Sequence, residues 1–486
     1  MTNNILKSIY PSIIKALCIV FNKSLTNGVF PVNMKLAVVK PLYKGKNKKE
    51  MNNYRPVSLL PVISKILEKV VNNRITKFLT KNKVLYEGQY GFRKQRSTSD
   101  AILDLTGNIL DGFNKGMYTL GLFLDMTKAF DSIKHETLFR KLEIYGVRGI
   151  SLKWIKSYLY NRSIQVNYND ILSEKVGIDY GTPQGSVLGP LLYIILANDL
   201  PKCLKFCNSV IFADDTTLFI SGNNLKFLYR KLNEDLIILS KWFDSNSLTL
   251  NIEKTHYILF KTKNKNVNYN GKVEIDGREI TRVSNVKFLG VILDEHLDWN
   301  SHVKSLLSKL TVGIYSLNMT KNILPYHAKR LLYLCNIQSH LSYALSSWGS
   351  MISQVCLRKI KVSQNKAIRA LFNLNRRTSL KPYFKKAKLP LLEDHIKLSL
   401  LHISHRYVNN ILPSRIVNLF ETVRHERHTR NRNNLLTPQH TLQIYNNSFL
   451  GRAPNYWLLL SNEIKNKTNS RLFSRGYLKY VFDGYS

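Results

Sequence analysis

Apolar positions in the first part of the chain follow a helical repeat that is broken at a few defined points. In residues 1–40 they recur near helical spacing, as at Ile9, Ile13, Ala16 and Val20. Gly28 and Pro31 interrupt the pattern, and a short strand is predicted at Leu36–Val39. Proline-containing coil is predicted from residue 54 onward. Further helices are predicted at Ile63–Leu79, about Ser99–Phe113, 135–160, Leu191–Ala197 and Leu225–Phe243.

The middle of the chain changes to short apolar runs that end in acidic residues. Thr119–Leu124 is apolar on both faces, which is typical of a buried strand, and it leads directly into Asp125. Val210–Ala213 and Thr216–Ile220 predict two strands around a two-residue acidic turn, Asp214–Asp215. A single strand is predicted at Val286–Leu293.

The last part of the chain is mainly helical and basic. Helices are predicted from Trp299 to about Ser347 and through 350–486, with an irregular piece at His425–Asn434. Mixed helices and antiparallel strands, followed by helices alone, predict an α+β fold with an α-helical basic C-terminal region.

The charge balance narrows the class of partner. The chain has 72 Lys and Arg residues against 32 Asp and Glu residues, for a formal net charge of +40. A positive field of that size attracts polyanions, and neutralised phosphates supply most non-specific affinity for nucleic acid. Lysine gained through AT-rich coding, a ribosome-like protein and a membrane-surface protein are the alternatives.

The cysteines and the apolar runs bear on the compartment. Five scattered cysteines do not form the pattern of a secreted disulfide framework. No segment approaches the ~20 apolar residues that a membrane helix needs, and the N-terminus lacks the layout of a signal peptide. We therefore expect no membrane association and an intracellular protein, in the nucleus, the cytoplasm or both.

The acidic residues at the ends of the predicted strands suggest a metal-binding catalytic site. If the strands are neighbours in one sheet, the carboxylates of Asp125, Asp214 and Asp215 face one another. Two Mg²⁺ ions held by such carboxylates can stabilise the attacking and leaving oxygens of nucleotidyl transfer, with Mn²⁺ as a substitute. The plainer alternative is that Asp-Asp forms an ordinary turn and that Asp125 caps the following helix.

Several motifs then carry a resemblance to reverse transcriptases of non-LTR retrotransposons, and within them to the jockey-like elements. Phe212–Asp215 resembles the aromatic-x-Asp-Asp box, Asp125–Asp131 resembles the motif around the first catalytic aspartate, and Gly181–Pro190 is similar to the loop between them. Further blocks resemble the family at Asn53–Leu60, Gln89–Arg93, Leu250–Thr255, Phe288–Val291 and, less specifically, Trp457–Ile464.

The resemblance implies a right-hand polymerase fold of fingers, palm and thumb, and it implies roles for individual residues. Asp125, Asp214 and Asp215 would be both catalytic and metal-binding. Phe130 would exclude a 2′-hydroxyl from the incoming sugar, and Gln184 and Gly185 would lie against the nascent base pair. Arg55 and Arg93 would bind the triphosphate, and Lys254 would act as a general acid on the pyrophosphate. A core aromatic (Phe130), solvated or template-binding arginines and a surface lysine are the alternatives.

The resemblance also sets the expected organisation and partners. We expect an N-terminal helical extension at 1–40, fingers and palm at 41–295, a thumb-like region at 296–360 and a basic helical region at 361–486. Arg424, Arg427, Arg430 and Arg432 are candidates for holding template RNA. The implied partners are an RNA template, a DNA primer or nicked target DNA, deoxynucleoside triphosphates and a separate endonuclease, because neither endonuclease nor RNase H features are seen. A catalytically silent RNA- or DNA-binding remnant and a maturase- or telomerase-like enzyme remain alternatives.

Overall fold

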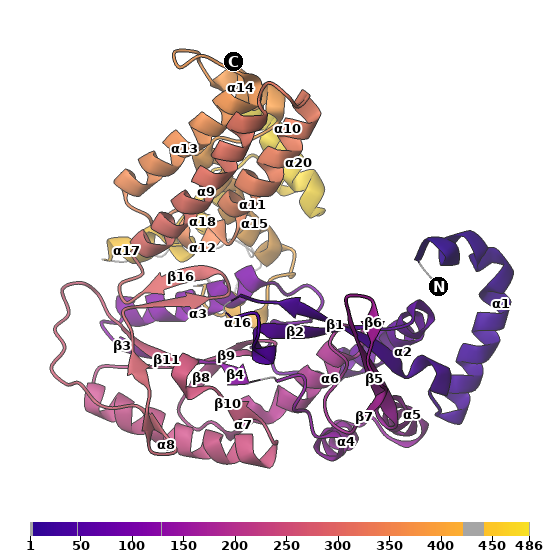
Figure 1. Ribbon diagram of the computed structural model, residues 1–486. Coiled ribbons are helices and arrows are strands. Elements are labelled where there is room, and N and C mark those ends of the chain that lie inside the picture. The colour runs from indigo at the N-terminus through magenta and orange to yellow at the C-terminus, as the bar shows by residue number, and fades with distance from the viewer. Residues whose placement is uncertain (1–2, 46, 128, 421–441, 486) are drawn as a thin grey trace.

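A computed structural model of the protein describes residues 3–45, 47–127, 129–420 and 442–485 (Figure 1). Two sheets with their helices form one lobe, and helices from the C-terminal part form a bundle on top of it. The irregular piece predicted at His425–Asn434, with the arginines proposed to hold RNA, lies outside the described residues.

The sheet lobe is built from helices of varied length between its strands. They are α1 (Asn3–Asn27), α2 (Val62–Lys81), α3 (Thr98–Asn114), α4 (His135–Ile144), α5 (Gly149–Leu159), α6 (Gly189–Leu196), α7 (Leu200–Cys203) and α8 (Leu225–Ser245), with short 3₁₀ turns η1 (Val32–Met34), η2 (Met51–Asn53), η3 (Ala197–Asp199) and η4 (Ile252–Lys254).

The central sheet has five strands in the order β14–β11–β3–β9–β8. Their bounds are β3 (Tyr118–Leu124), β8 (Asn208–Phe212), β9 (Asp215–Gly222), β11 (His256–Phe260) and β14 (Thr281–Arg282). Every residue of β3 is buried, as its apolar sequence predicts. Phe123 packs into the core that contains α3, whereas Leu122 packs into the core that contains α8, so helices cover both faces.

A second sheet has the order β2–β1–β5–β6, with β7 beside β5. Its strands are β1 (Leu36–Tyr43), β2 (Tyr54–Leu59), β5 (Arg162–Tyr168), β6 (Ile171–Leu172) and β7 (Val176–Ile178). Three small pairs complete the strands: β4 (Met126–Thr127) with β10 (Thr249–Leu250), β12 (Glu274–Ile275) with β13 (Arg278–Glu279), and β15 (Asn285–Phe288) with β16 (Val291–Asp294).

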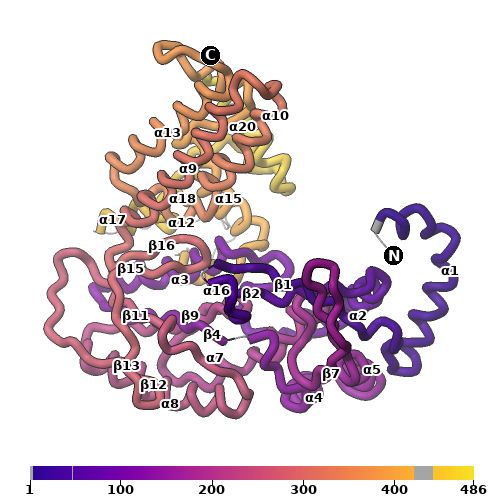
Figure 2. The backbone as a smooth tube through the Cα atoms, in the orientation of Figure 1, coloured from indigo at the N-terminus to yellow at the C-terminus, as the bar shows by residue number. Residues whose placement is uncertain are grey.

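The C-terminal bundle rests on α3 (Figure 2). Helices α12, α16 and α17 contact α3, while α9 packs on α13 and α15 packs on α18. The elements are α9 (Asn300–Thr320), α10 (Tyr326–Tyr333), the π-helix η5 (Leu334–Gln338), α11 (Ser339–Ser342), α12 (Leu345–Trp348), α13 (Gln354–Phe372), α14 (Lys381–Ala387), α15 (Leu392–Val408), α16 (Ser414–Val417), α17 (Gln443–Asn447), α18 (Phe449–Leu458), α19 (Asn462–Lys465) and α20 (Ser470–Asp483).

Three predicted elements differ from the structure. The segment read as coil at residue 54 is strand β2, and Pro56 is tolerated there because β2 lies at the edge of its sheet. The helix predicted at 135–160 is two helices, separated where Gly146 and Gly149 take positive φ angles. The single strand predicted at Val286–Leu293 is the hairpin β15–β16, which turns at Leu289 and Gly290.

The N-terminal helix also departs from expectation. Residues Asn4–Asn27 are long and apolar enough to cross a membrane by length and composition, and none of the apolar window is buried. The expectation that no segment approaches this length was therefore wrong for α1. A single such helix near the N-terminus is weak evidence, because signal sequences and core helices pass the same test.

Candidate active site

The central sheet brings the three predicted carboxylates to one end. Strands β3 and β9 are neighbours, with Leu124 opposite Thr216. Asp125 comes directly after Leu124 and Asp215 directly before Thr216, so both acids lie at the same end of the two strands. Strands β8 and β9 form a hairpin in which Phe212 pairs with Asp215. The two turn residues are therefore Ala213 and Asp214, one position earlier than the sequence predicts.

The electrostatics of this edge reflect crowded acids. Partial burial, together with the charges of the neighbouring Asp214 and Asp125 carboxylates, raises the pKa of Asp215 to about 6. Burial also raises the pKa of Asp214, assisted by Asp125 and opposed by Arg55. Like charges near one another favour the protonated form, so these carboxylates repel one another when ionised.

Segments beyond the hairpin hold Asp125 in place. Its N–H donates to the hydroxyl of buried Thr255 at 3.3 Å, and its carbonyl accepts from the N–H of Asn251 at 2.8 Å. The Nζ of Lys254 lies 3.8 Å from the Asp125 carboxylate, with both side chains largely exposed to solvent. Lys254, the predicted general acid, is thus a cation beside Asp125, and the charge of Arg55, the predicted phosphate ligand, opposes the rise in the pKa of Asp214.

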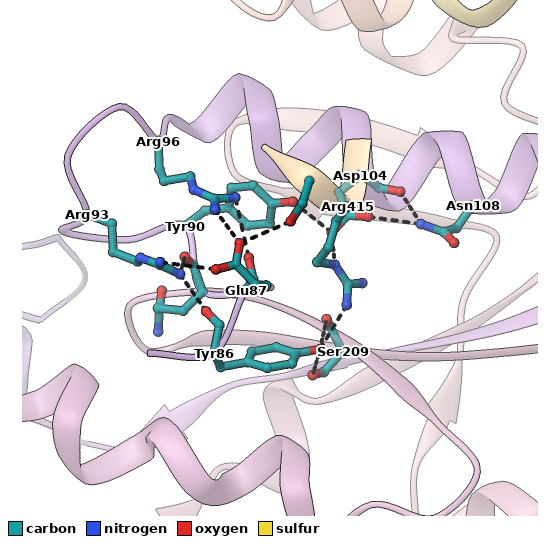
Figure 3. Close-up of polar contacts among 11 residues, drawn as sticks. Tyr86, Glu87, Tyr90, Arg93, Arg96, Asp104, Asn108, Ser209 and Arg415 are labelled. Atoms are coloured by element: carbon teal, nitrogen blue, oxygen red, sulfur yellow. Dashed lines mark hydrogen bonds and ion pairs between the residues drawn. The ribbon is translucent and has the colours of Figure 1, made fainter. Parts of the chain in front are cut away.

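Arg93 is placed differently. Its guanidinium donates to the carbonyl oxygens of Tyr86 at 2.5 Å and Gln89 at 3.3 Å and lies 3.7 Å from the Glu87 carboxylate (Figure 3). Its side chain is only 14% exposed. These contacts use the guanidinium within its own segment, so a triphosphate would have to compete for it.

Phe130 is connected to the carboxylates by an aromatic neighbour, Tyr193. Its ring packs on Tyr193 with centroids 4.8 Å apart, and the Phe92 ring is nearly perpendicular to it, with centroids 6.4 Å apart. The charges of Asp214 and Asp215 act on the Tyr193 hydroxyl, so that ring bridges Phe130 and the acids. Phe130 is partly buried, so its side chain keeps some exposure to solvent.

The loop with Gln184 and Gly185 is held by hydrogen bonds to Asp131 and Ser58. The side-chain amide of Gln184 donates to both carboxylate oxygens of Asp131, at 2.9 and 2.8 Å, and the backbone carbonyl of Gln184 accepts from the N–H of Ser58. Gly185 has a φ of 124°, and a Cβ there would come within 2.6 Å of the Ser58 carbonyl. The close backbone approach that requires glycine is thus to strand β2.

Metal ligands are not preassembled in the part of the chain that is described. No group of three His, Cys, Asp or Glu side chains there is close enough together to hold an ion. The carboxylates of Asp125, Asp214 and Asp215 are still the right donors for a hard cation, since Mg²⁺ prefers oxygen ligands and retains part of its water.

Sequence reasoning missed Tyr193, Thr255 and Asp131 as contributors to this site. The sequence predicts Tyr193 as part of a buried helix, and its polar hydroxyl in that apolar run is the available signal. Asp131 belongs to a motif that was recognised, but its contact with Gln184 depends on a fold that brings two loops together.

The comparisons with known proteins concern the family of the chain. Residues 46–293 match the family described as "Reverse transcriptase (RNA-dependent DNA polymerase)". The chain is 31% identical to a "Probable RNA-directed DNA polymerase from transposon BS" of Drosophila melanogaster, over 76% of this chain and 42% of that protein. It is 26% identical to the "RNA-directed DNA polymerase from mobile element jockey" of the same species, over 85% and 45%. The chain spans less than half the length of these curated relatives.

Solved structures give only a distant likeness. A telomerase from Candida albicans with a telomeric RNA fragment matches 77% of this chain and 63% of its own, at 14% identity and a TM-score of 0.37. The RNA-dependent RNA polymerase of a human picobirnavirus matches 74% and 61%, at 10% identity and a TM-score of 0.41.

The family match covers more than half of the chain and includes the strands that carry all three acids. The fold is accordingly the right-hand polymerase fold, with an α-helical, basic C-terminal region. The chain belongs to the reverse transcriptase (RNA-dependent DNA polymerase) family, and it is similar to the jockey-like polymerases of non-LTR retrotransposons.

Proposed function

We propose that this chain extends a DNA 3′-end on an RNA template by two-metal-ion nucleotidyl transfer. The observation that carries the proposal is the meeting of Asp125, Asp214 and Asp215 at one end of adjacent strands β3 and β9, with the pKa of Asp215 raised to about 6. Carboxylates that raise one another's pKa are typical of sites that bind cations.

The carboxylates of Asp125 and Asp214, assisted by Asp215, would hold two Mg²⁺ ions, and Mn²⁺ could replace them. When bound, these ions stabilise the attacking 3′-oxygen and the leaving pyrophosphate. Arg55 then attracts the triphosphate, with Arg93 as a weaker candidate because its guanidinium is already occupied. Lys254, 3.8 Å from Asp125, donates a proton toward the pyrophosphate.

Two further features support a sugar and base contact. The partly exposed ring of Phe130 next to Tyr193 provides an apolar wall that a 2′-hydroxyl would meet. The loop of Gln184 and Gly185 is fixed to Asp131 and Ser58, so it offers a rigid surface to the nascent base pair. The domain bounds at 40, 295 and 360 remain predictions.

The proposed partners follow from the same reading. They are an RNA template, a DNA primer or nicked target DNA, deoxynucleoside triphosphates and a separate endonuclease. The expectations that endonuclease and RNase H domains are lacking and that the protein acts in the nucleus or the cytoplasm remain predictions.

The test is primer extension with an RNA template, a DNA primer, deoxynucleotides and Mg²⁺. The parent protein should extend the primer, and Asp214→Ala/Asp215→Ala should not. Asp170→Asn is the matched control, because Asp170 is an exposed acid in another hairpin turn with positive φ, 62°. It should retain parental activity.

Failure of the parent in Mg²⁺ and in Mn²⁺, with template binding intact, would overturn the proposal. The catalytically silent RNA- or DNA-binding remnant, consistent with the net charge of +40, would then be the better account. A parent that copies DNA templates but not RNA would overturn the template assignment alone.

A further inference from the structure

The turn that carries Asp214 contains a conformation that is unfavourable for its residue. Ala213, directly before Asp214, has a φ of 59°. The two-residue hairpin turns need positive φ at this position, which glycine adopts easily and alanine does not. Something outside the hairpin must therefore favour this geometry.

Gln89 makes that contact. Its side-chain Oε1 accepts a hydrogen bond of 3.1 Å from the N–H of Ala213 and one of 2.8 Å from the N–H of Gly91. Gln89 is only 4% exposed, so this oxygen is screened from water. A buried N–H that loses its acceptor destabilises the structure around it, and the turn is already strained.

The backbone of the segment that contains Gln89 packs closely against strand β8, with no room for larger residues at its glycines. Ile211 donates to the carbonyl of Gly88 at 2.9 Å and accepts from the N–H of Tyr90 at 2.8 Å. A Cβ on Gly91 would collide with the backbone nitrogen of Ala213, and one on Gly88 would come within 2.8 Å of the Ser209 carbonyl. The two glycines are what allow Gln89 to reach the turn.

A side chain from the C-terminal helices supports this segment from both ends. Arg415 of α16 donates from Nε to the buried Asp104 carboxylate at 2.6 Å and from Nη1 to the Tyr86 hydroxyl at 3.0 Å (Figure 3). The Tyr90 hydroxyl donates to the same Asp104 oxygen at 2.9 Å, and Tyr86 donates to the Ser209 carbonyl at 3.0 Å. Gln89 lies in the chain between these two anchored tyrosines.

We propose that Gln89 is a positioning residue that holds the Ala213–Asp214 turn in its working geometry, and that Arg415 makes the C-terminal helices part of this support. The proposal rests on the proposed polymerase function, since the turn carries Asp214 and leads directly into Asp215. It assigns a role to the C-terminal region that needs no contact between that region and substrate.

The first test compares Gln89→Met, which keeps the side-chain length but removes the acceptor, with the parent and with Gln354→Met at an exposed glutamine. Gln89→Met should lower kcat about 10- to 100-fold, the scale expected of a small displacement of catalytic groups, with KM for deoxynucleotide and template affinity within about twofold. Gln354→Met should match the parent.

The second test asks whether relief of the strained residue rescues the enzyme. Glycine at position 213 takes a positive φ without strain. Gln89→Met/Ala213→Gly should therefore regain much of the lost kcat, whereas a loss caused by general destabilisation would persist in the double variant. Persistence of the full loss would overturn the positioning role.

The third test does not depend on activity. Hydrogen exchange in the peptide 208–222 should be faster in Gln89→Met than in the parent. In Arg415→Met it should be faster in both 86–91 and 208–222, with Arg358→Met, an exposed arginine, as the control. An exchange rate in Gln89→Met equal to that of the parent would overturn the proposal. An exchange rate in Arg415→Met equal to that of the parent would overturn the supporting role proposed for Arg415.

These readouts separate the two proposals. A parent protein that extends no primer but shows the predicted changes in exchange would contradict the proposed function and leave Gln89 as the residue that holds the turn. A parent that extends primers, with Gln89→Met unchanged in both kcat and exchange, would contradict the positioning role alone.

Discussion

The buried carboxylate of Glu68 accepts a hydrogen bond of 2.7 Å from the backbone N–H of Val187. It also accepts from the N–H of Leu188 at 3.3 Å and from the Ser64 hydroxyl at 2.8 Å. Helix α2 thereby fixes the loop that presents Gln184 next to the site. The charge of Glu68 is compensated by N–H and O–H donors, as a buried carboxylate requires.

Replacement of Glu68 should therefore destabilise the fold. Glu68→Met leaves these donors without an acceptor and should lower the free energy of unfolding by about 3 kcal/mol, measured by denaturant titration. Glu68→Gln keeps one acceptor oxygen and should cost less. Glu143→Met, at an exposed helical acid, is the control and should be nearly neutral. An equal loss in Glu143→Met would contradict the assignment.

Phe130 gives a prediction about sugar selectivity. Phe130→Val removes the wall beside Tyr193 and should raise ribonucleotide incorporation relative to deoxynucleotide by about 10- to 100-fold, as kcat/KM ratios in single-nucleotide extension. Phe227→Val, at a half-exposed aromatic on α8, should leave the ratio unchanged. An unchanged ratio in Phe130→Val would make Phe130 a packing residue only.

The acids of the site could be predicted from sequence because their signal is local. A strand as apolar as Thr119–Leu124 must be buried on both faces, and an acid at its end must lie at the edge of a sheet. The hairpin of Asp214 and Asp215 gives the same signal. The prediction also needed the two strands to be neighbours in one sheet, and the pairing of β3 with β9 confirms this.

The supporting contacts could not be predicted, because they join segments that are far apart in the chain. Arg93 is an exception, since its partners Tyr86 and Gln89 are near it in the chain, but these carbonyl contacts depend on how the loop folds and not on residue type. Nothing local to Gly185 says that Ser58 is its neighbour. The turn itself was misplaced by one residue because a two-residue acidic turn fits the composition of Asp214–Asp215 better than the observed Ala213–Asp214.

The raised pKa of Asp215 gives a prediction about pH. A folded-state pKa of about 6, above the ordinary 3.8, means that the folded protein binds this proton more tightly than the unfolded chain does. The contribution of Asp215 to stability is thus favourable at low pH and is lost as the pH rises through about 6. In metal-free buffer, the free energy of unfolding of the parent relative to Asp215→Asn should fall between pH 4 and 7.

The comparison must be made as a difference between the two proteins. Burial lowers the pKa of His302, His395 and His402 to about 4, so these groups give a stability slope of opposite sign. Because both proteins contain them, the difference isolates position 215. Mg²⁺ favours the ionised carboxylate and should flatten the slope of the parent only. A flat difference without metal would contradict the raised pKa.

The ion pair between Arg406 and Asp100 gives the last prediction. Arg406 of α15 donates to both oxygens of Asp100 on α3, at 2.6 and 3.2 Å, and Asp100 is 1% exposed. Removing one partner of a buried pair leaves an uncompensated charge. Arg406→Met should therefore lower the free energy of unfolding by about 3–5 kcal/mol, measured by denaturant titration.

The matching double variant identifies the cause. Asp100→Asn/Arg406→Met removes both charges and should recover much of that loss, because the cost comes from the stranded carboxylate and not from the absent arginine. Lys361→Met is the control, since its pair with Glu393 is exposed on both sides and such pairs contribute only about 0–1 kcal/mol. If the double variant were no more stable than Arg406→Met, the loss would come from packing of the arginine stem, and the charge argument would fail.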